Sequence, residues 1–340
     1  WLSTPRDNRI PIVFWGHPSL GDEIYNVIHQ FELKNPKYKV MVGTACSLDV
    51  TGDAQRLLSA IAGGVPPDVV WFDRFAIGEW ASRGALTDLT PYLKKQDPKD
   101  PYRIQLSQYY PWAIEEASYK PPGSKGPARL YGIPTEADVR IFYANSDLLR
   151  QAGYVLPNGE PRLPKNWTEL REYANKLTRF RIPGDKKSGI VRLGFAPRTG
   201  NSWLYLYAWQ AGGEFMNADH TICTLDSPPV VRALRWMTEV YDDLGGAGQV
   251  SALEQSFQGG AMNPFVQNII AMKTDSDDEM RWIADYRPDM DFVVSAPPIP
   301  ADRMDKGPVT WSGGFALVIP TTAKQKEGAF KFMQYLYSWE

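Results

Sequence analysis

The chain has 340 residues, which is more than one ordinary hydrophobic core holds, so its length favours two domains. Hydrophobic residues make up 43% of it and charged residues 22%, a composition typical of soluble globular proteins. No apolar run approaches the roughly 20 residues that a membrane-spanning helix needs. The formal net charge is −2, with Lys and Arg scattered among acids, which argues against nucleic acid as a partner.

The N-terminus and the cysteines add little. Residues 1–8 are polar and predict no signal peptide, although an exported protein would look the same once its signal had been removed. Cys46 and Cys223 match no metal-site spacing and predict two separate thiols. The 12 Trp and 17 Tyr are numerous enough to line a pocket as well as fill a core.

Strands and helices alternate from the start of the chain. Strands are predicted at 10–15, 38–42 and 68–72, with a helix capped by Ser19 after the first and a helix beginning at Asp53 after the second. Helical spacing turns the following residues inward: Ile24, Val27, Ile28, Phe31, Leu57, Leu58 and Ile61. This order with short connections is typical of a parallel α/β sheet.

The later elements are less regular. Residues 91–128, rich in Pro, Tyr and Lys, predict an irregular surface excursion, and 130–143 is an extended run whose Pro134 suits a segment crossing between domains. Thr168 is predicted to cap a helix over 168–177, although 166–168 also fits a glycosylation acceptor. The other expected helices are 147–151, 202–210, one starting at Asp226 and 323–339; the other expected strands are 191–196, 269–273, 291–295 and 314–319.

Two stretches stand where parallel α/β sheets bind ligands, beyond the carboxyl ends of their strands. Residues 15–19, which include His17, follow the first strand, and residues 71–75 follow the third. There Asp73 and Arg74 place opposite charges among aromatic side chains, which a surface ion pair of small energetic value does not explain. Phe75 and Trp80, which lead into the next helix, are expected in the core.

Motifs for catalysis and cofactors are missing from the sequence. It contains no nucleotide-binding glycine motif, no HExxH and no GxSxG, so we expect no cofactor, no metal and no catalytic residue. The acidic run of Asp275, Asp277, Asp278 and Glu279 is open to two readings, a metal site or, more commonly, the start of a helix.

Several runs in order resemble the extracellular solute-binding proteins of family 1, the sugar-binding receptors of ABC transporters. The resemblance covers essentially the whole chain and rests on DRFAIGEWASRGALTDLT, YGIPTEADVRIFYANSDLLRQAG, NWTELREYANKLT, AMNPFVQNIIAMKTD and WSGGFALVIPTTAKQKEGAFKFMQYLYS. Family members usually continue beyond the helix that ends near Trp339 here, so a last segment that returns to the second lobe is expected to be missing.

The resemblance implies a two-lobed α/β fold of the type II periplasmic-binding-protein kind, each lobe a mixed, mainly parallel sheet flanked by helices. It implies a first lobe of residues 1–137 plus 293–340 and a second lobe of residues 138–292. The hinge crossings are expected near 134–140 and 292–298.

The resemblance also implies a function. It predicts an exported, monomeric, non-enzymatic receptor, periplasmic or at the cell surface and with a lipid anchor as one form, which closes on a carbohydrate and presents it to the membrane permease of an ABC importer. Asp73 and Arg74 align with a sugar-contacting pair, and Glu136 with a ligand-binding glutamate, of a maltose-binding relative. The full set of expected ligand-binding residues is Trp15, His17, Trp71, Asp73, Arg74, Glu136, Asn201, Trp203, Asp275, Asp278, Trp311 and Gly313.

Two other functions stay open at this point. Asp73 and Glu136 could serve a carbohydrate-active hydrolase as acid and base, which would need a fitting separation around one glycosidic bond. The solute could instead be a polyamine, a glycerol phosphate or iron. A phosphate ligand would call for several Lys or Arg, and a cationic one for acids such as those of 275–278.

Overall fold

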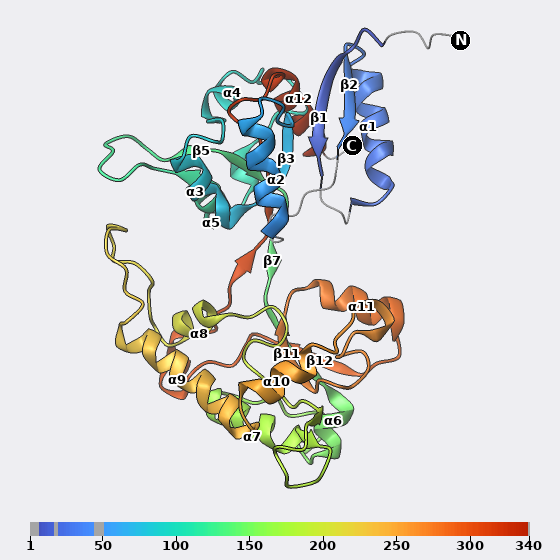
Figure 1. The fold of residues 1–340 in the computed structure, drawn as a ribbon, viewed down its shortest axis with the longest axis vertical. Coiled ribbons are helices and arrows are strands. Elements are labelled where there is room, and N and C mark those ends of the chain that lie inside the picture. Colours follow the sequence, from blue (N-terminus) through green and yellow to red (C-terminus); the bar gives the residue numbers. More distant parts are fainter. Residues whose placement is uncertain (1–6, 17–19, 44–50, 339–340) are drawn as a thin grey trace. The chain divides into compact units, whose positions relative to one another are not determined.

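A computed structural model of the chain describes residues 7–16, 20–43 and 51–338, with only the backbone of 51–53. The chain forms two compact units, unit 1 (Trp1–Ala137 and Gly313–Glu340) and unit 2 (Asp138–Ser312) (Figure 1). The sequence had placed the return to the first lobe at 293, whereas the structure places it at Gly313. The difference has a physical cause, because the strand Phe292–Ser295 pairs with Phe142–Asn145 inside unit 2.

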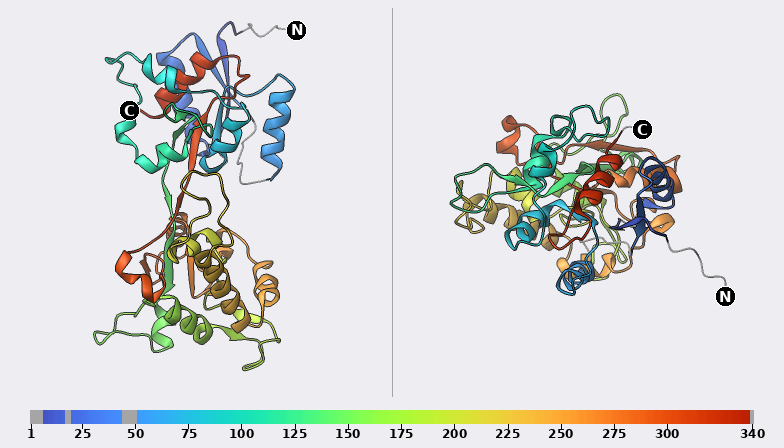
Figure 2. Two further views of the ribbon diagram at one scale, coloured as in Figure 1. Left: turned by 90° about the vertical axis from the view of Figure 1, so that its left-hand side faces the viewer. Right: turned by 90° about the horizontal axis from the view of Figure 1, so that it is seen from above.

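Unit 1 combines the first elements of the chain with the last. Its strands are β1 (Ile10–Trp15), β2 (Tyr38–Val42), β3 (Val69–Asp73), β4 (Ser118–Tyr119), β5 (Arg129–Leu130), β6 (Gly132–Pro134) and β14 (Phe315–Val318). Its helices are α1 (Glu23–Lys34), α2 (Thr51–Ala62), α3 (Ile77–Ser82), α4 (Thr90–Lys94), α5 (Pro111–Glu116) and α12 (Lys326–Leu336). Figures 1 and 2 show α12, coloured red, among the blue N-terminal elements.

Unit 2 holds the middle of the chain. Its strands are β7 (Asp138–Val139), β8 (Ile141–Asn145), β9 (Arg179–Phe180), β10 (Ile190–Arg192), β11 (Met272–Asp275) and β12 (Phe292–Ser295). Its helices are α6 (Ser146–Gln151), α7 (Trp167–Leu177), α8 (Leu204–Gln210), α9 (Pro228–Asp243), α10 (Ala247–Glu254) and α11 (Asp278–Tyr286). Strand β13 (Ser312–Gly313) carries the chain back to unit 1. Within the described residues, no helix combines the length and the apolar character that crossing a bilayer would require.

The sheets contain less parallel pairing than the sequence suggested. In unit 1 the order is β2-β1-β3-β14-β6, with β1 parallel to β2 and β3 but β14 antiparallel to β3 and β6. In unit 2 the order is β11-β8-β12, and both pairings are antiparallel. The expectation of a mainly parallel second sheet was therefore wrong. Its parallel contacts are isolated bridges, such as Leu193 with Ile270 and Gly200 with Thr274.

Several local expectations also change. The stretch 91–128 is not irregular throughout, because α5, β4 and most of α4 lie in it. The extended run 130–143 is broken into β6, β7 and β8. Helix α7 is capped by Asn166, whose side chain accepts a hydrogen bond from the backbone N–H of Glu169 at 3.1 Å, and not by Thr168. Leu58, expected inward, is exposed.

Each unit buries its own core. In unit 1, β1 and β3 bury Phe14 and Phe72, and the ring of Phe31 from α1 lies 5.0 Å from that of Phe332 from α12. In unit 2, the ring of Trp167 stacks 4.4 Å from that of Trp236, and its indole N–H bonds to Gln210 at 3.0 Å. These contacts join elements far apart in sequence, so each core fixes the position of its own sheet.

The carboxylate of Asp68 connects the two sequence segments of unit 1. Asp68 is buried; one of its oxygens accepts from the N–H of Val13 at 2.9 Å and the other from the N–H of Gln325, just before α12, at 2.9 Å. A buried carboxylate with two backbone donors is strongly favoured over its unbonded state. These two hydrogen bonds therefore hold the start of β3, the strand that ends at Asp73, against β1 and the segment before α12.

We expect Asp68→Ala to lower the free energy of unfolding by about 2–4 kcal/mol, because it leaves the half-buried backbone N–H groups of Val13 and Gln325 without their acceptor. The measurement is urea denaturation followed by tryptophan fluorescence. Asp97→Ala is the matched control, since the Asp97 carboxylate is exposed and accepts from the nearby N–H of Lys99. Equal losses for the two variants would contradict this account of unit 1.

Candidate functional site

Asp73 lies at the carboxyl end of β3, where the fold pattern predicted a binding residue. It is half-buried, and its side chain accepts a hydrogen bond from the N–H of Phe75 at 3.2 Å, which starts the short helical turn 74–76. This bond fixes the carboxylate at the strand end. A carboxylate has two oxygens with about four acceptor positions, so the same group can also accept a hydroxyl of a solute.

The aromatic residues that adjoin Asp73 in sequence are buried and exposed in a different way from that expected. Phe75, predicted to be core, is 70% exposed, whereas Trp80 is buried with its ring 5.1 Å from that of Phe72. Trp71 is half-buried, with its ring 6.2 Å from that of Phe315. The exposed apolar face beside the carboxylate therefore belongs to Phe75, which the sequence reading missed.

Trp15 ends β1, the neighbour of β3 in the sheet, and is half-buried. The guanidinium of Arg56 lies 5.2 Å from its ring centre, a cation–π contact inside unit 1. His17, also expected at this edge, lies outside the described residues.

Arg74 has a different position from the one predicted. Its side chain is fully buried: Nε donates to the Glu116 carboxylate at 2.8 Å, Nη1 donates to the carbonyls of Glu136 and Phe315, and Nη2 donates to the carbonyl of Gly313. The ring of Trp112 lies 5.4 Å from the guanidinium. The sequence analysis predicted that this guanidinium would bind a solute, but in unit 1 it donates hydrogen bonds to backbone carbonyls.

Glu136 and Gly313 meet at Arg74 through their carbonyls, while the Glu136 residue as a whole is exposed. The next residue, Gly314, has φ +128°, and a side chain there would put Cβ 2.7 Å from Nη1 of Arg74 and 2.9 Å from the Glu136 carbonyl oxygen. Gly314 is thus required by its positive φ and by its close approach to Arg74.

In unit 2, Asn201 and Trp203 form one small structure. The N–H of Asn201 donates to the carbonyl of Thr274 at 3.1 Å, and its side-chain oxygen accepts from the indole N–H of Trp203 at 3.1 Å. Trp203 is 43% exposed. The Arg198 guanidinium lies 4.9 Å from the Trp203 ring. An amide can hydrogen-bond the hydroxyls of a saccharide, and an oriented, exposed indole can pack against its C–H faces.

The acidic run splits into residues with different roles. Asp275 is half-buried and forms an ion pair with Lys273 at 2.7 Å, and Lys273 also pairs with the buried Glu279 at 2.6 Å. Asp278 is exposed in the first turn of α11, the helix start that the sequence had weighed against a metal site. In the described part of the chain, no group of three or more His, Cys, Asp or Glu is arranged to hold a metal ion.

Arg140 is a residue that the sequence reading missed. It is 3% exposed, pairs with the Asp138 carboxylate, donates through Nε to the Asn201 carbonyl at 3.0 Å and stacks 3.7 Å from the ring of Trp311. Trp311, expected to touch ligand, is therefore half-buried behind a cation, and its buried indole N–H has no hydrogen-bond partner. The sequence signal that could have identified Arg140 is its position two residues after Asp138 in an extended run, which places the two side chains on the same face of a strand.

Asp277 lies close to Asp138 in this cluster. Burial raises the pKa of the Asp277 carboxyl, and the neighbouring Asp138 carboxylate raises it further. Two carboxylates that share a site oppose each other's ionisation. Their repulsion is offset on one side by Arg140, which pairs with Asp138.

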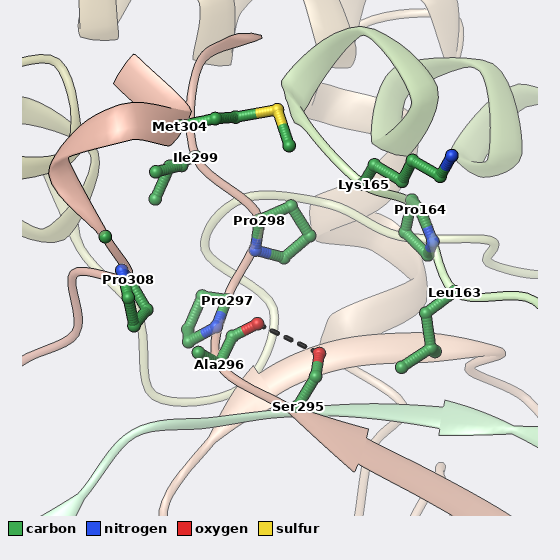
Figure 3. A pocket seen from close by; sticks show the side chains of 11 residues that line it. Leu163, Pro164, Lys165, Ser295, Ala296, Pro297, Pro298, Ile299, Met304 and Pro308 are labelled. Atoms are coloured by element: carbon green, nitrogen blue, oxygen red, sulfur yellow. Dashed lines mark hydrogen bonds between the residues drawn. The ribbon is translucent and has the colours of Figure 1, made fainter.

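A hollow of about 380 Å³ on unit 2 does not coincide with the predicted residues (Figure 3). None of the expected ligand-binding residues lines it. Its walls are mostly apolar and rich in proline: Leu163, Pro164, Lys165, Ser295, Ala296, Pro297, Pro298, Ile299, Met304, Gly307 and Pro308. We place the candidate site at Asp73 and at Asn201 instead, because polar groups and exposed aromatic faces occur together there.

Comparison with known sequences gives consistent relatives. The sequence model of one protein family, the bacterial extracellular solute-binding proteins, matches residues 17–340 of this chain. The arabinooligosaccharide-binding protein of Bacillus subtilis (strain 168) is 23% identical over 98% of this chain and 70% of that protein. A protein of Brucella abortus (strain 2308) named as a binding protein is 28% identical over 62% of this chain and 47% of its own length. The chain thus spans about half the length of this Brucella protein.

Solved structures show the same fold. CpMnBP1 with mannotriose bound has a TM-score of 0.76 and 23% identity, covering 96% of this chain and 78% of that one. The ABC substrate-binding protein Lmo0181 of Listeria monocytogenes, in complex with cycloalternan, has a TM-score of 0.70 and 23% identity, covering 96% and 75%. UgpB of Mycobacterium tuberculosis, in complex with glycerophosphocholine, has a TM-score of 0.70 and 24% identity, covering 96% and 74%. The two-lobed type II periplasmic-binding-protein fold expected from the sequence is confirmed.

We expect Asp277→Asn to raise the melting temperature at pH 7. The raised pKa of Asp277 means that the folded state holds this proton more tightly than the unfolded state, so ionisation at neutral pH costs stability. The gain should shrink as the pH falls toward the unfolded value of about 3.9, where the carboxyl is protonated in both states. Thermal melts from pH 4 to pH 8 measure it.

Asp278→Asn is the control for this experiment, because Asp278 is an exposed neighbour in the same helix turn. A gain for Asp277→Asn that does not depend on pH would contradict the assigned repulsion from Asp138.

Proposed function

We propose that this chain, which belongs to the family of bacterial extracellular solute-binding proteins, binds a carbohydrate. The observation that carries the proposal is at the end of β3, where the Asp73 carboxylate is held in place next to the exposed face of Phe75. A saccharide presents hydroxyls and flat C–H faces. It therefore needs fixed acceptors and exposed rings at the same place.

Unit 2 supports the same ligand chemistry. Asn201 offers an amide, and Trp203 offers an exposed ring whose N–H is already bonded to Asn201. The names of the compared proteins support it as well, since arabinooligosaccharide, mannotriose and cycloalternan appear in them. The ligand is a saccharide, and Asp73, Phe75, Asn201 and Trp203 are the residues that contact it.

The proposed role is that of a receptor for an ABC importer. Binding shifts a two-lobed protein toward the state that the solute prefers, and this closed state is what a membrane permease recognises. The protein works outside the cytoplasm, in the periplasm or at the cell surface. A lipoprotein of Streptomyces antibioticus, 32% identical over 36% of this chain, supports a lipid-anchored form. The working unit is a monomer.

The receptor does not catalyse a reaction on its solute. Of the two carboxylates considered for a hydrolase, Asp73 is held by the N–H of Phe75, and the Glu136 backbone is bound by the buried Arg74. Nothing in this arrangement assigns an acid and a base to one glycosidic bond. Release of free sugars from a bound oligosaccharide, followed by mass spectrometry, would overturn the proposal.

A phosphate-bearing solute is the alternative suggested by the glycerophosphocholine complex of UgpB. Phosphate recognition requires cationic or N–H donors that face the ligand. Two of the three arginines near the candidate residues, Arg74 and Arg140, are buried and bonded inside their own units, and the third, Arg198, is exposed against the ring of Trp203. One exposed cation is less than phosphate recognition usually recruits, which favours a neutral saccharide.

Asp73→Ala should weaken saccharide binding by about tenfold or more, because hydroxyl bonds to a charged acceptor contribute about 1.5–3 kcal/mol. Titration calorimetry against mono-, di- and oligosaccharides, with glycerophosphocholine in the same panel, measures the change. Asp97→Ala is the matched control, an exposed aspartate of unit 1. Binding of glycerophosphocholine alone would mean that the ligand class is wrong.

Trp203→Ala should weaken binding of the same saccharide by about tenfold, since ring contacts contribute about 0.5–1.5 kcal/mol beyond the area they bury. Tyr286→Ala is the control, because Tyr286 is exposed to a similar degree, 47% against 43%, and lies at the end of α11. If a saccharide binds and neither Asp73→Ala nor Trp203→Ala weakens it, the site is elsewhere on the chain.

A further inference from the structure

A positively charged hairpin follows α7 in unit 2. Residues 176–192, here called the basic hairpin, carry six Lys or Arg and one Asp, a net charge of +5, whereas the whole chain has a net charge of −2. Strands β9 and β10 pair antiparallel in it, and the loop 181–189 connects them. Five of its cations are exposed and Arg192 is half-buried; the six are Lys176, Arg179, Arg181, Lys186, Lys187 and Arg192.

The cations of the basic hairpin lie together without an internal counter-charge. Arg179 and Arg192 are directly opposite each other in the strand pair, where like charges are destabilising. Arg179 donates to the carbonyl of Thr178 at 3.0 Å and Arg192 to that of Leu177 at 3.3 Å, so both bond to backbone at the end of α7. Burial lowers the pKa of the Arg192 guanidinium, and the charge of Arg179 lowers it further. In the described part of the chain, none of the six side chains forms an ion pair with a carboxylate.

Two acids beside the basic hairpin are engaged by other groups. Asp185, in the loop, accepts from the backbone N–H of Lys187 at 2.8 Å. Asp243 of α9 is paired with Arg171, and this bond is the main cause of its lowered pKa, with a smaller contribution from Lys186. The positive field of the basic hairpin therefore faces the solvent.

Aliphatic side chains are exposed beside these charges. Ile182 is 58% exposed and Val191 is 49% exposed. The partners of Ile190 and Arg192 are adjacent residues of β9, so Val191 between them lies in a bulge. Ile190 is buried, whereas Val191 at the bulge is not. Cations next to exposed aliphatic groups are typical of protein surfaces that meet lipid headgroups.

Hydrogen bonds order the loop of the basic hairpin. The hydroxyl of Ser188 accepts from the N–H of Ile182 at 2.9 Å and donates to the carbonyl of Asp185 at 2.7 Å. The N–H of Arg181 donates to the carbonyl of Gly189 at 2.9 Å. An ordered loop loses little conformational entropy on binding, so Arg181 and Ile182 are available for contact at a low cost.

We propose that the basic hairpin binds the surface of a membrane that contains anionic phospholipid. Its cations contact the phosphates, and Ile182 and Val191 enter the boundary between headgroups and acyl chains. A nucleic acid is the other common polyanion, but exposed aliphatic groups do not help to bind a phosphate backbone. The aromatic residue of the basic hairpin, Phe180, is half-buried, so it offers no open ring for a base. Only the use of this contact in the cell rests on the proposed location outside the cytoplasm.

Flotation of the solute-free, full-length chain with lipid vesicles tests the proposal. We expect binding to vesicles of equal parts phosphatidylglycerol and phosphatidylcholine, little binding to phosphatidylcholine alone, and weaker binding as salt is added. Combining Arg181→Gln with Lys187→Gln should weaken binding by about tenfold or more, because each cation near an anionic surface contributes about fivefold.

The matched control combines Lys120→Gln with Lys125→Gln. These two exposed lysines lie in the loop between β4 and β5 of unit 1, and their replacement changes the net charge by the same amount. This control should leave vesicle binding unchanged. Equal losses for the two double variants would overturn the proposal, because net charge alone would then explain the binding.

Ile182→Ser tests the aliphatic contact. It should weaken vesicle binding by about fivefold, because burial of an aliphatic side chain in the membrane boundary is lost. Ile222→Ser is the control, since Ile222 is a 62% exposed isoleucine in another loop of unit 2. A short DNA duplex is the second probe.

Two further outcomes would overturn the proposal. One is that the unchanged chain does not bind the anionic vesicles. The other is that it binds the DNA duplex more tightly than the vesicles and that Ile182→Ser weakens neither, which would assign the basic hairpin to nucleic acid. Thermal melts establish that each variant is folded. A chain that binds vesicles through the basic hairpin but binds no saccharide loses the proposed function and keeps the membrane contact.

Discussion

The buried charge of Arg74 is the constraint on which the candidate site of unit 1 depends. A guanidinium without solvent contact must be paired inside the protein, and the partners available at the end of β3 are backbone carbonyls and one glutamate. The paths of residues 136 and 313–315 follow from this pairing, as does the glycine at 314. Asp73, the neighbour of Arg74, is consequently attached to a rigid part of the fold, which is where a binding carboxylate is most effective.

Much of the fold could be predicted from the sequence because its signals are local. The alternation in β1 and β3, the 3.6-residue periodicity of α9 and the resemblance over the whole chain identify two α/β units of this fold. Pairing direction could not be predicted in the same way. The strand at 292–295 was assigned to a crossing, yet it pairs antiparallel with β8, a choice made by long-range contacts that a single sequence does not display.

The site was predictable in part, and the failures share one cause. A single sequence does not reveal which group a charged side chain pairs with, so Arg74 and Asp275 were both interpreted as facing a solute. In the structure, Arg74 bonds to carbonyls 62 or more residues away, and Asp275 pairs with Lys273, two residues earlier on the same strand. The prediction for Phe75 was wrong in the opposite sense. A phenylalanine is usually buried, but the position of Phe75 in the turn after Asp73 exposes its side chain.

Burial of the arginines also bears on what the protein recognises. Two of the three arginines near the candidate residues, Arg74 and Arg140, are paired with internal carbonyls and carboxylates, and the third, Arg198, is exposed against the ring of Trp203. In unit 1 the candidate groups are the Asp73 carboxylate and the exposed ring of Phe75, and in unit 2 they are the Asn201 amide and the exposed ring of Trp203. For the proposed saccharide ligand, groups of this kind select by the placement of hydroxyls and by ring contact more than by charge. Internal pairing of Arg74 and Arg140 withdraws two cations from the surroundings of the candidate groups, which agrees with the proposed neutral, polyhydroxylated ligand.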